Sequence, residues 1–481
     1  MPPPATATAP TECIDSRTYE SAVHDLNSLQ SNYQTLQQIK ESGGQLNEYS
    51  LPEFEAFIEK TGHTVTDLNR LNVIHITGTK GKGSTCAFVD SVLRQTGKLK
   101  VGLYTSPHLI EVRERIRING EPLSREAFGK YFYQVYDKIR ASKPELRKVH
   151  EGSPDMPMYF RFLTLMAFHA FLAEGVDVAV VEVGVGGQYD STNVIRQPVV
   201  CGIASLGLDH QAALGATIDQ IAWHKAGIIK PRVPVFTVSQ PHDALNVIRQ
   251  RAEKCSAPLQ VVTPLPDTQE LGIPGIHQRT NAALASALCH TFSQRTGHVI
   301  SATCIADGLR LAQWPGRSQR FVSPRNPKLT WFVDGAHTIE SISACAQWFA
   351  SLDHPSRCLL LFNPAKGRES KELLATLLEV TGECQWIGAV FCPNVSVSRA
   401  DSINKNMPED ADLAIQHDAA QVWESLQPSS SAPAAAKHIV PSINRAVELI
   451  ESKYADAPLH VLVTGSMHLV GGVLDIAKGS I

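Results

Sequence analysis

The chain has 481 residues, a formal net charge of −3 and ten cysteines. Because one hydrophobic core rarely covers more than about 300 residues, this length predicts two domains. A hydrophobic content of 43% and a charged content of 19% suit a globular protein, and the near-neutral charge argues against general nucleic-acid binding. No apolar run approaches the roughly 20 residues that span a bilayer, so we expect no membrane span.

The opening stretch is rich in Pro, Ala and Thr, so residues 1–20 are predicted to form a disordered N-terminus. Glu12 and Asp15 precede the first basic residue, Arg17, which is unlike a mitochondrial transit peptide. We therefore expect a cytoplasmic protein. A mitochondrial form made from another start site stays open.

A glycine-rich turn follows a β-branched run at 73–77 and precedes a helical stretch that stops at Gly97. The turn consists of Gly78, Thr79, Lys80, Gly81, Lys82, Gly83, Ser84 and Thr85. Glycines let backbone N–H groups surround an anion, and the helix N-terminus adds donors and partial positive charge. Lys82 can reach the outer phosphates of a nucleotide, and Ser84 can ligate magnesium. The order differs from the standard P-loop, since Lys82 precedes the last glycine, and a plain glycine-rich connector is the alternative.

Buried apolar runs alternate with helical stretches along the chain, which predicts an α/β fold with a mostly parallel sheet covered on both faces. The first strands are predicted at 73–77, 99–104, 176–183, 199–206 and 233–238. After a joint at 314–318 the pattern restarts, with strands predicted at 329–333, 358–362, 386–391 and 460–464. We predict a P-loop ATP-binding domain over 21–316 and a smaller, Rossmann-like α/β domain over 317–481. A low-complexity surface loop is predicted at 428–436.

Polar side chains follow three of the predicted strands. Ser106 follows the second strand, Glu182 ends the third, and Asp209 and His210 follow the fourth. Since ligands of open parallel sheets gather at the carboxyl ends of strands, these groups and Ser84 could surround one or two hard cations. Taken singly, Glu182 could pair with a lysine and His210 could cap a loop.

A capping box at Thr217 and Gln220 predicts the start of a helix that ends at Gly227. Lys225 lies in the last turn of this helix, where a lysine complements the helix dipole. Spacing alone favours that structural role over a functional one.

Two further features suit a large anionic ligand. Asp334 and His337 follow the strand at 329–333, where a closing second domain would contact a ligand held by the first. Three alternating arginines would share one face of a strand, suited either to a polyanionic substrate or to solvent. They are Arg113, Arg115 and Arg117.

Taken together, these motifs resemble those of the folylpolyglutamate synthases, a family of the Mur ligase superfamily. The matching segments are 75–84 (His-Ile-Thr-Gly-Thr-Lys-Gly-Lys-Gly-Ser), 106–109 (Ser-Pro-His-Leu), 113–119, 181–187 (Val-Glu-Val-Gly-Val-Gly-Gly), 208–210, 224–228, 334–337 (Asp-Gly-Ala-His) and 463–466. The segments 106–109 and 159–164 are similar to the eukaryotic branch. The resemblance implies a Mur-ligase-like fold and ATP-dependent addition of L-glutamate to the γ-carboxyl of tetrahydrofolate or folylpolyglutamate, through an acyl phosphate.

The resemblance also implies two Mg²⁺ sites and a chemical modification. Lys225 would be carbamylated and would join Glu182 and His210 around one Mg²⁺, while Ser84, Ser106 and Glu182 serve the other. A monovalent cation is a further expected ligand.

The resemblance implies nucleotide contacts and catalytic roles as well. The nucleotide contacts beyond the glycine-rich turn would be Asn281, Arg317 and Asp334. The catalytic residues would be Lys82, Lys225, His210 and His337, the last near the acyl phosphate and the incoming glutamate. Residues 188–192 depart from the family in detail, and no role is assigned to them. We expect a monomer.

Three other functions stay open from sequence. Dihydrofolate synthase, or a bifunctional enzyme, would share this fold and chemistry, and the eukaryotic-type segment at 106–109 favours the polyglutamating enzyme over it. A P-loop NTPase that drives movement is disfavoured by the order of the glycine-rich turn and by Lys225. A catalytically inactive nucleotide-binding regulator is disfavoured because no site position is visibly lost.

Overall fold

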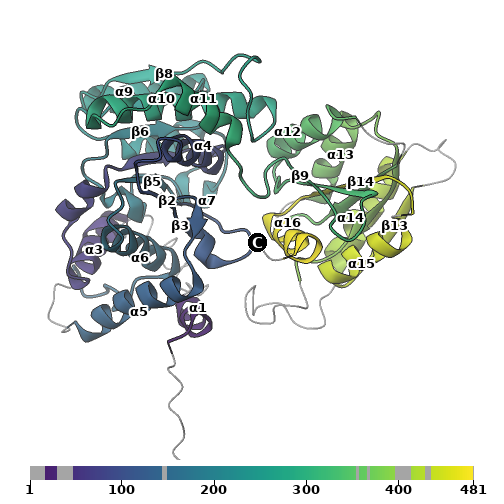
Figure 1. The fold of residues 1–481 in the computed structure, drawn as a ribbon, viewed down its shortest axis with the longest axis horizontal. Coiled ribbons are helices and arrows are strands. Elements are labelled where there is room, and N and C mark those ends of the chain that lie inside the picture. Colours follow the sequence, from purple (N-terminus) through teal and green to yellow (C-terminus); the bar gives the residue numbers. More distant parts are fainter. Residues whose placement is uncertain are drawn as a thin grey trace, which may run out of the picture.

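The computed structural model describes residues 17–29, 47–142, 149–353, 357–365, 369–395, 413–427, 435–454 and 456–479. They form two α/β lobes, each built on one sheet (Figure 1). Of the segment predicted to be disordered, residues 1–16 lie outside the described ranges, and helix α1 begins at Tyr19. Most of the loop predicted at 428–436 also lies outside them. No helix in the described ranges has the length and apolar character needed to cross a bilayer.

The first lobe contains an eight-stranded sheet in the order β4-β3-β2-β5-β1-β6-β7-β8. Its strands are β1 (Ile74–Thr77), β2 (Val101–Tyr104), β3 (Ile116–Ile118), β4 (Glu121–Pro122), β5 (Val178–Glu182), β6 (Val200–Ile203), β7 (Val235–Thr237) and β8 (Leu259–Val261). Strands β3 and β4 form an antiparallel edge, and the other six run parallel. The mostly parallel sheet predicted from sequence is confirmed.

Helices cover both faces of this sheet, so side chains of opposite parity along one strand enter two different cores. On β5, Val178 and Val180 pack beneath α4, α10 and α11, whereas Ala179 and Val181 pack on the side of α1, α3, α5 and α6. The helices of this lobe are α1 (Tyr19–Ser28), α3 (Asn47–Lys60), η1 (Val65–Leu71), α4 (Lys82–Arg94), η2 (Val112–Arg115), α5 (Arg125–Ala141), α6 (Tyr159–Ala173), η3 (Ser191–Val194), α7 (Gln211–Leu214), α8 (Ile218–Lys225), η4 (Ala226–Ile228), α9 (His242–Lys254), α10 (Ile276–Thr296) and α11 (Ala302–Leu311).

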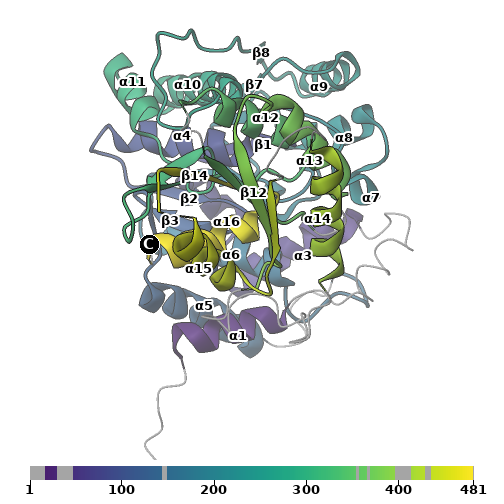
Figure 2. The same ribbon diagram turned by 90° about the vertical axis from the view of Figure 1, so that its right-hand side faces the viewer.

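The second lobe contains a six-stranded sheet in the order β13-β12-β11-β14-β10-β9, with β9 antiparallel at one edge (Figure 2). Its strands are β9 (Gln319–Val322), β10 (Leu329–Val333), β11 (Cys358–Phe362), β12 (Trp386–Phe391), β13 (Ala436–Ile439) and β14 (Leu459–Thr464). Its helices are α12 (Ile339–Ala350), α13 (Ser370–Val380), α14 (Ala414–Leu426), α15 (Ile443–Lys453), α16 (Met467–Val473) and η5 (Leu474–Lys478). The prediction that the α/β pattern restarts after residue 318 is confirmed.

The prediction that three arginines share one strand face is wrong. Arg113 and Arg115 belong to the 3₁₀ turn η2, and only Arg117 lies on β3. The turn forms because the Glu114 carboxylate accepts hydrogen bonds from backbone N–H groups at its start, as part of a capping box with Glu111.

Helix α8 begins as predicted, with a capping box between Thr217 and Gln220. It does not end in a left-handed glycine. Lys225 closes the helix, and the chain continues into η4, where Gly227 has no left-handed φ. A Cβ on Gly227 would lie 2.5 Å from the Cα of Gln188, so this glycine allows two backbones to approach closely.

We therefore expect Gly227→Ala to destabilise the chain by about 1–3 kcal/mol, because the added methyl group meets backbone that cannot give way. Gly382→Ala is the matched control, since its Cβ would find its nearest neighbour at 3.6 Å. Denaturant midpoints of the two variants measure the difference. Equal midpoints would contradict the packing role of Gly227.

Candidate active site

The glycine-rich turn after β1 is held between the segments that follow β5 and β6, because β1 pairs with both strands. On the β6 side, the backbone N–H groups of Thr79 and Lys80 donate to the Ser205 carbonyl at 2.8 and 3.0 Å. On the β5 side, the Thr77 hydroxyl donates to the Gly186 carbonyl at 2.8 Å. The sheet order therefore brings three strand ends to one place.

Two glycines of the turn are required by close approach as well as by backbone angle. Gly78 has a φ of 155°, and a Cβ there would lie 2.8 Å from the Ala204 Cβ. Gly81 has a φ of 82°, and its Cβ would lie 2.2 Å from Oδ1 of Asn281. Asn281 is thus placed directly against the turn by α10, as its predicted nucleotide role requires.

A cavity of about 900 Å³ opens at this turn and is lined by both lobes. The predicted site residues that line it are Thr79, Lys80, Gly81, Lys82, Gly83, Ser84, Ser106, Glu182, His210, Asn281, Arg317, Asp334 and His337. Three predicted residues lie behind its wall: Gly78, Thr85 and Lys225. The structure thus gathers residues from distant parts of the sequence around one space.

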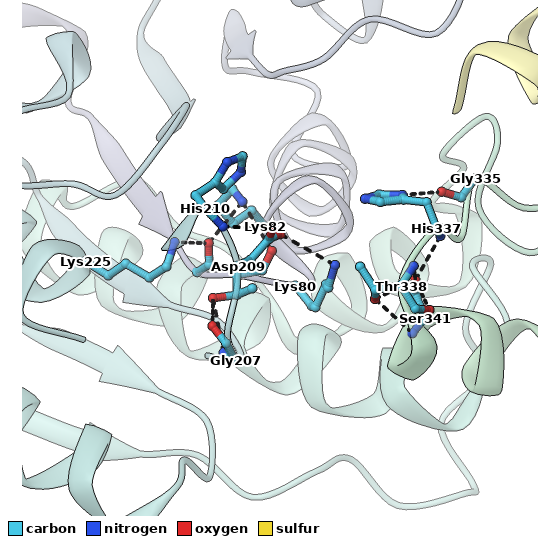
Figure 3. A network of polar contacts seen from close by, with 12 residues as sticks. Lys80, Lys82, Gly207, Asp209, His210, Lys225, Gly335, His337, Thr338 and Ser341 are labelled. Carbon is cyan, nitrogen blue, oxygen red and sulfur yellow. Dashed lines mark hydrogen bonds and ion pairs between the residues drawn. The ribbon is translucent and has the colours of Figure 1, made fainter. Parts of the chain in front are cut away.

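Two lysine side chains converge on one carbonyl of the turn (Figure 3). The ammonium groups of Lys225 and Lys82 donate to the Gly78 carbonyl at 2.7 and 3.0 Å. Only 3% of the Lys225 surface is exposed, and burial, aided by the charge of Lys82, lowers the pKa of Lys225 to about 7. Asp209 and Asp190 oppose this shift, but Asp209 lies 3.8 Å from Lys80 and pairs with that lysine instead.

The carboxylate at the end of β5 faces the same region. Glu182 is 4% exposed, and its Oε2 accepts a hydrogen bond from the Ser106 backbone N–H at 2.9 Å. Burial raises the pKa of Glu182, although the positive charge of Lys82 acts in the opposite direction. His210 has a left-handed φ of 50°, and burial lowers its pKa, which favours the neutral imidazole that binds metals.

The described residues contain no group of three or more His, Cys, Asp and Glu side chains placed to hold a metal ion. The predicted ligands are of a different kind: hydroxyls, one carboxylate, one imidazole and one lysine. Mg²⁺ is commonly bound through one or two carboxylates and fills much of its octahedron with phosphate and water oxygens. The buried hydroxyl of Ser84 and the buried carboxyl of Glu182 fit that pattern.

The second lobe closes the cavity with the segment after β10. The Asp334 carboxylate is anchored by backbone N–H groups, from Ser318 at 2.7 Å and from Ala336 at 2.9 Å. His337 donates through Nδ1 to the Gly335 carbonyl at 2.9 Å, which fixes the orientation of its ring. These two side chains therefore line the same cavity as the glycine-rich turn of the first lobe, in fixed orientations.

The arginine segment divides into two parts. Arg115 and Arg117 line the cavity. Arg113 does not, because its guanidinium binds the Glu111 carboxylate and donates to the Leu123 carbonyl at 3.1 Å. Only two of the three arginines can therefore meet a ligand in this cavity.

Three of the cavity residues that were given no role from sequence have polar contacts or burial that bear on the site. Gln278 donates to the Ser84 hydroxyl at 3.4 Å and accepts from Asn281 at 2.9 Å. Trp314 stacks below Arg117, whose guanidinium lies 5.4 Å from the ring centre. Asp190 is half-buried, and desolvation raises its pKa. A signal existed for Gln278, which is one helical turn from Asn281, and for Asp190, which follows the glycines after β5.

The wall formed by the first lobe carries Lys80, Lys82 and the backbone N–H groups of the glycine-rich turn. The wall formed by the second lobe carries the Asp334 carboxylate and the His337 imidazole. A polyphosphate would be bound by the first wall. A second reactant held by the opposite lobe would lie against the terminal phosphate.

No protein-family model matches the chain. The chain is 41% identical to the mitochondrial folylpolyglutamate synthase of Cricetulus griseus, with 96% of this chain and 92% of that protein covered. It is 41% identical to the folylpolyglutamate synthase of Candida albicans, covering 95% and 96% of the two chains. The solved structure of Mycobacterium tuberculosis folylpolyglutamate synthase complexed with ADP and AMPPCP is 25% identical, with a TM-score of 0.72 over 89% of this chain and 96% of that one. A relative of this identity and coverage establishes that the chain belongs to the folylpolyglutamate synthase family.

Proposed function

We propose that this chain is an ATP-dependent ligase that adds L-glutamate to the γ-carboxyl of tetrahydrofolate or folylpolyglutamate, releasing ADP and phosphate. Family membership supports the reaction. The structural observation that carries it is the cavity between the lobes, where the phosphate-binding turn faces Asp334 and His337. A ligase needs such a two-walled site, because its activated intermediate must meet an amine before it meets water.

The chemistry follows from these parts. An oxygen of the folate γ-carboxylate attacks the γ-phosphorus of ATP, the bond to ADP breaks, and an acyl phosphate forms. The amine of L-glutamate then attacks the acyl carbon, phosphate leaves, and the nitrogen gives up a proton. Lys82 and the N–H groups of the turn stabilise charge on the transferring phosphoryl group. His337, whose ring lines the cavity in a fixed orientation, lies where it could orient the amine.

Two Mg²⁺ ions are part of the proposal. Ser84, Ser106 and Glu182 would hold one, and Glu182, His210 and a carbamylated Lys225 would hold the other. When bound, such ions supply a positive field for the phosphoryl oxygens. A monovalent cation remains a prediction.

Carbamylation of Lys225 is supported by burial without a counter-charge. Its ammonium donates to the Gly78 carbonyl, and among the described residues no carboxylate lies within ion-pairing distance of it. A buried, unpaired ammonium is costly. If the neutral amine adds to the carbon of carbon dioxide and releases one proton, the side chain becomes an anion suited to the cations beside it.

Two properties of the whole protein belong to the proposal. The name of the Cricetulus griseus relative includes the word mitochondrial, which supports a mitochondrial form beside the expected cytoplasmic one. The chain is expected to be monomeric, since the cavity is completed by its own second lobe.

The direct test supplies the purified chain with ATP, labelled L-glutamate and either tetrahydrofolate or dihydropteroate. We expect label to enter the tetrahydrofolate product, with ADP formed in equal amount. Incorporation with dihydropteroate alone would assign the dihydrofolate synthase reaction, and ATP hydrolysis without incorporation would contradict a ligase.

Lys82→Ala should lower kcat about a hundredfold or more, because it removes a charge aimed at the phosphoryl group. Stability should change little, since the side chain is only half-buried. Lys98→Ala, at an exposed position beyond the same helix, is the control. Near-normal turnover of the Lys82 variant would remove this lysine from the mechanism.

Lys225→Arg separates carbamylation from a helix-dipole role. Arginine keeps the positive charge at the end of α8, but its guanidinium does not lose a proton in proteins and cannot form the carbamate. We expect loss of activity in Lys225→Arg as complete as in Lys225→Ala. Lys230→Arg is the matched control, since Lys230 also donates to a backbone carbonyl, that of Asn193 at 3.1 Å, outside the cavity.

Native mass measurement of the wild-type chain should show one added carboxyl group that disappears in both Lys225 variants. An active Lys225→Arg enzyme without that mass would return Lys225 to the helix-dipole role.

A further inference from the structure

Residues 106–114 form a loop that is closed at its base and reaches from the first lobe to the second. The Thr105 backbone N–H donates to the Arg115 carbonyl at 3.0 Å, so the two ends of the loop lie side by side. We call residues 106–114 the docking loop. Part of it, including Ser106 and His108, lines the cavity.

One carboxylate holds the docking loop in shape. Glu114 accepts three backbone hydrogen bonds, from Leu109 at 2.9 Å, from Ile110 at 3.0 Å and from Glu111 at 2.6 Å. Three successive N–H groups thus point inward at one side chain. Charge-assisted bonds of this kind are stronger than neutral ones, so the loop behaves as a rigid unit.

The tip of the docking loop is packed in the core of the second lobe. Leu109 and Ile110 are 6% and 5% exposed and belong to the same apolar cluster as Val470 and Val473 of α16. A Cβ on Gly471 would lie only 2.1 Å from the Leu109 carbonyl oxygen. Helix α16 therefore rests directly on the loop backbone, and only glycine at position 471 permits that distance.

The other end of the docking loop touches the catalytic side of the cavity. Ser106 donates through its backbone N–H to Glu182 at 2.9 Å, and Arg115 donates to His108 Nδ1 at 3.0 Å. Between Ser106 and Leu109 lie only two residues. A displacement of α16 from Leu109 would therefore also shift the Ser106 backbone N–H that donates to the Glu182 carboxyl.

We propose that Glu114 and Gly471 are positioning residues. Gly471 lets α16 pack against the backbone of Leu109, and Glu114 keeps the docking loop rigid, so that the position of the second lobe determines the position of the Ser106 backbone N–H beside Glu182. The inference rests on the proposed function for its kinetic consequence. The lobes would be catalytically competent only when α16 is seated on Leu109. Neither residue needs to touch the reacting atoms.

The sharpest test compares Gly471→Ala with Gly472→Ala. Both replace glycine by the best helix former on the same helix, so helix propensity favours both equally. The methyl group at 471 meets the Leu109 carbonyl, which belongs to the loop backbone, whereas at 472 it meets the end of the Ile443 side chain, within the second lobe. Only Gly471→Ala should push the lobes apart.

We expect Gly471→Ala to lower kcat at least tenfold, with the KM for ATP changed less than threefold, because the phosphate-binding turn is untouched. Small-angle scattering should show a larger radius of gyration for this variant than for Gly472→Ala. If both variants match each other in scattering and in kcat, the inference is overturned.

A second pair of variants tests the loop itself. Glu114→Gln removes one acceptor oxygen and places an NH₂ group against an N–H donor. We therefore expect kcat to fall, while the KM for ATP again changes less than threefold. Glu126→Gln, at an exposed position in the first turn of α5 and outside the cavity, makes the same change of charge and should leave kcat near normal. Equal kcat in these two variants would exclude Glu114 as a positioning residue.

The wild-type chain, assayed beside the variants, separates this inference from the proposed function. Absence of folate-dependent ligation in the wild type would refute the function and leave the scattering comparison to decide the lobe seating. Normal ligation in the wild type with no difference between the alanine variants would refute the inference alone.

Discussion

The parallel pairing of β1 with β5 on one side and β6 on the other is the constraint on which the site depends. It places the glycine-rich turn between the Glu182 carboxyl and the Ser205 carbonyl, which no local sequence preference could do. The close approach of Gly78 to Ala204 follows from the same pairing. The backbone donors of the turn, the Glu182 carboxyl beside it and the two converging lysines thus share one place because of sheet order.

The electrostatics of the site follow from burial more than from exposed ion pairs. Burial lowers the pKa of Lys225 and raises that of Glu182, so each group is biased towards its neutral form. The same bias makes Lys225 a better nucleophile towards carbon dioxide than an exposed lysine would be.

Much of the architecture could be predicted because it depends on local pattern. The strands β10, β11 and β12 have the predicted bounds, and α8 begins at the predicted capping box. The short edge strands β4, β8, β9 and β13 were missed, since strands of two to four residues with exposed positions leave little apolar signal. The arginines at 113 and 115 were misassigned because a side chain to backbone cap outcompeted the strand. Gln278 and Trp314 meet the turn only through tertiary packing, and the roles of the predicted site residues remain predictions.

The presence of Leu109 and Ile110 in the core of the second lobe has a consequence for how this protein can be divided. The joint at 314–318 separates the two sheets along the sequence, but the cores do not separate there. A fragment that starts after the joint would carry a gap where two apolar side chains belong, and a chimera that exchanges second lobes between relatives would have to exchange the docking loop with them. The docking loop and the chain after the joint, which are far apart in the sequence, must therefore be transferred together.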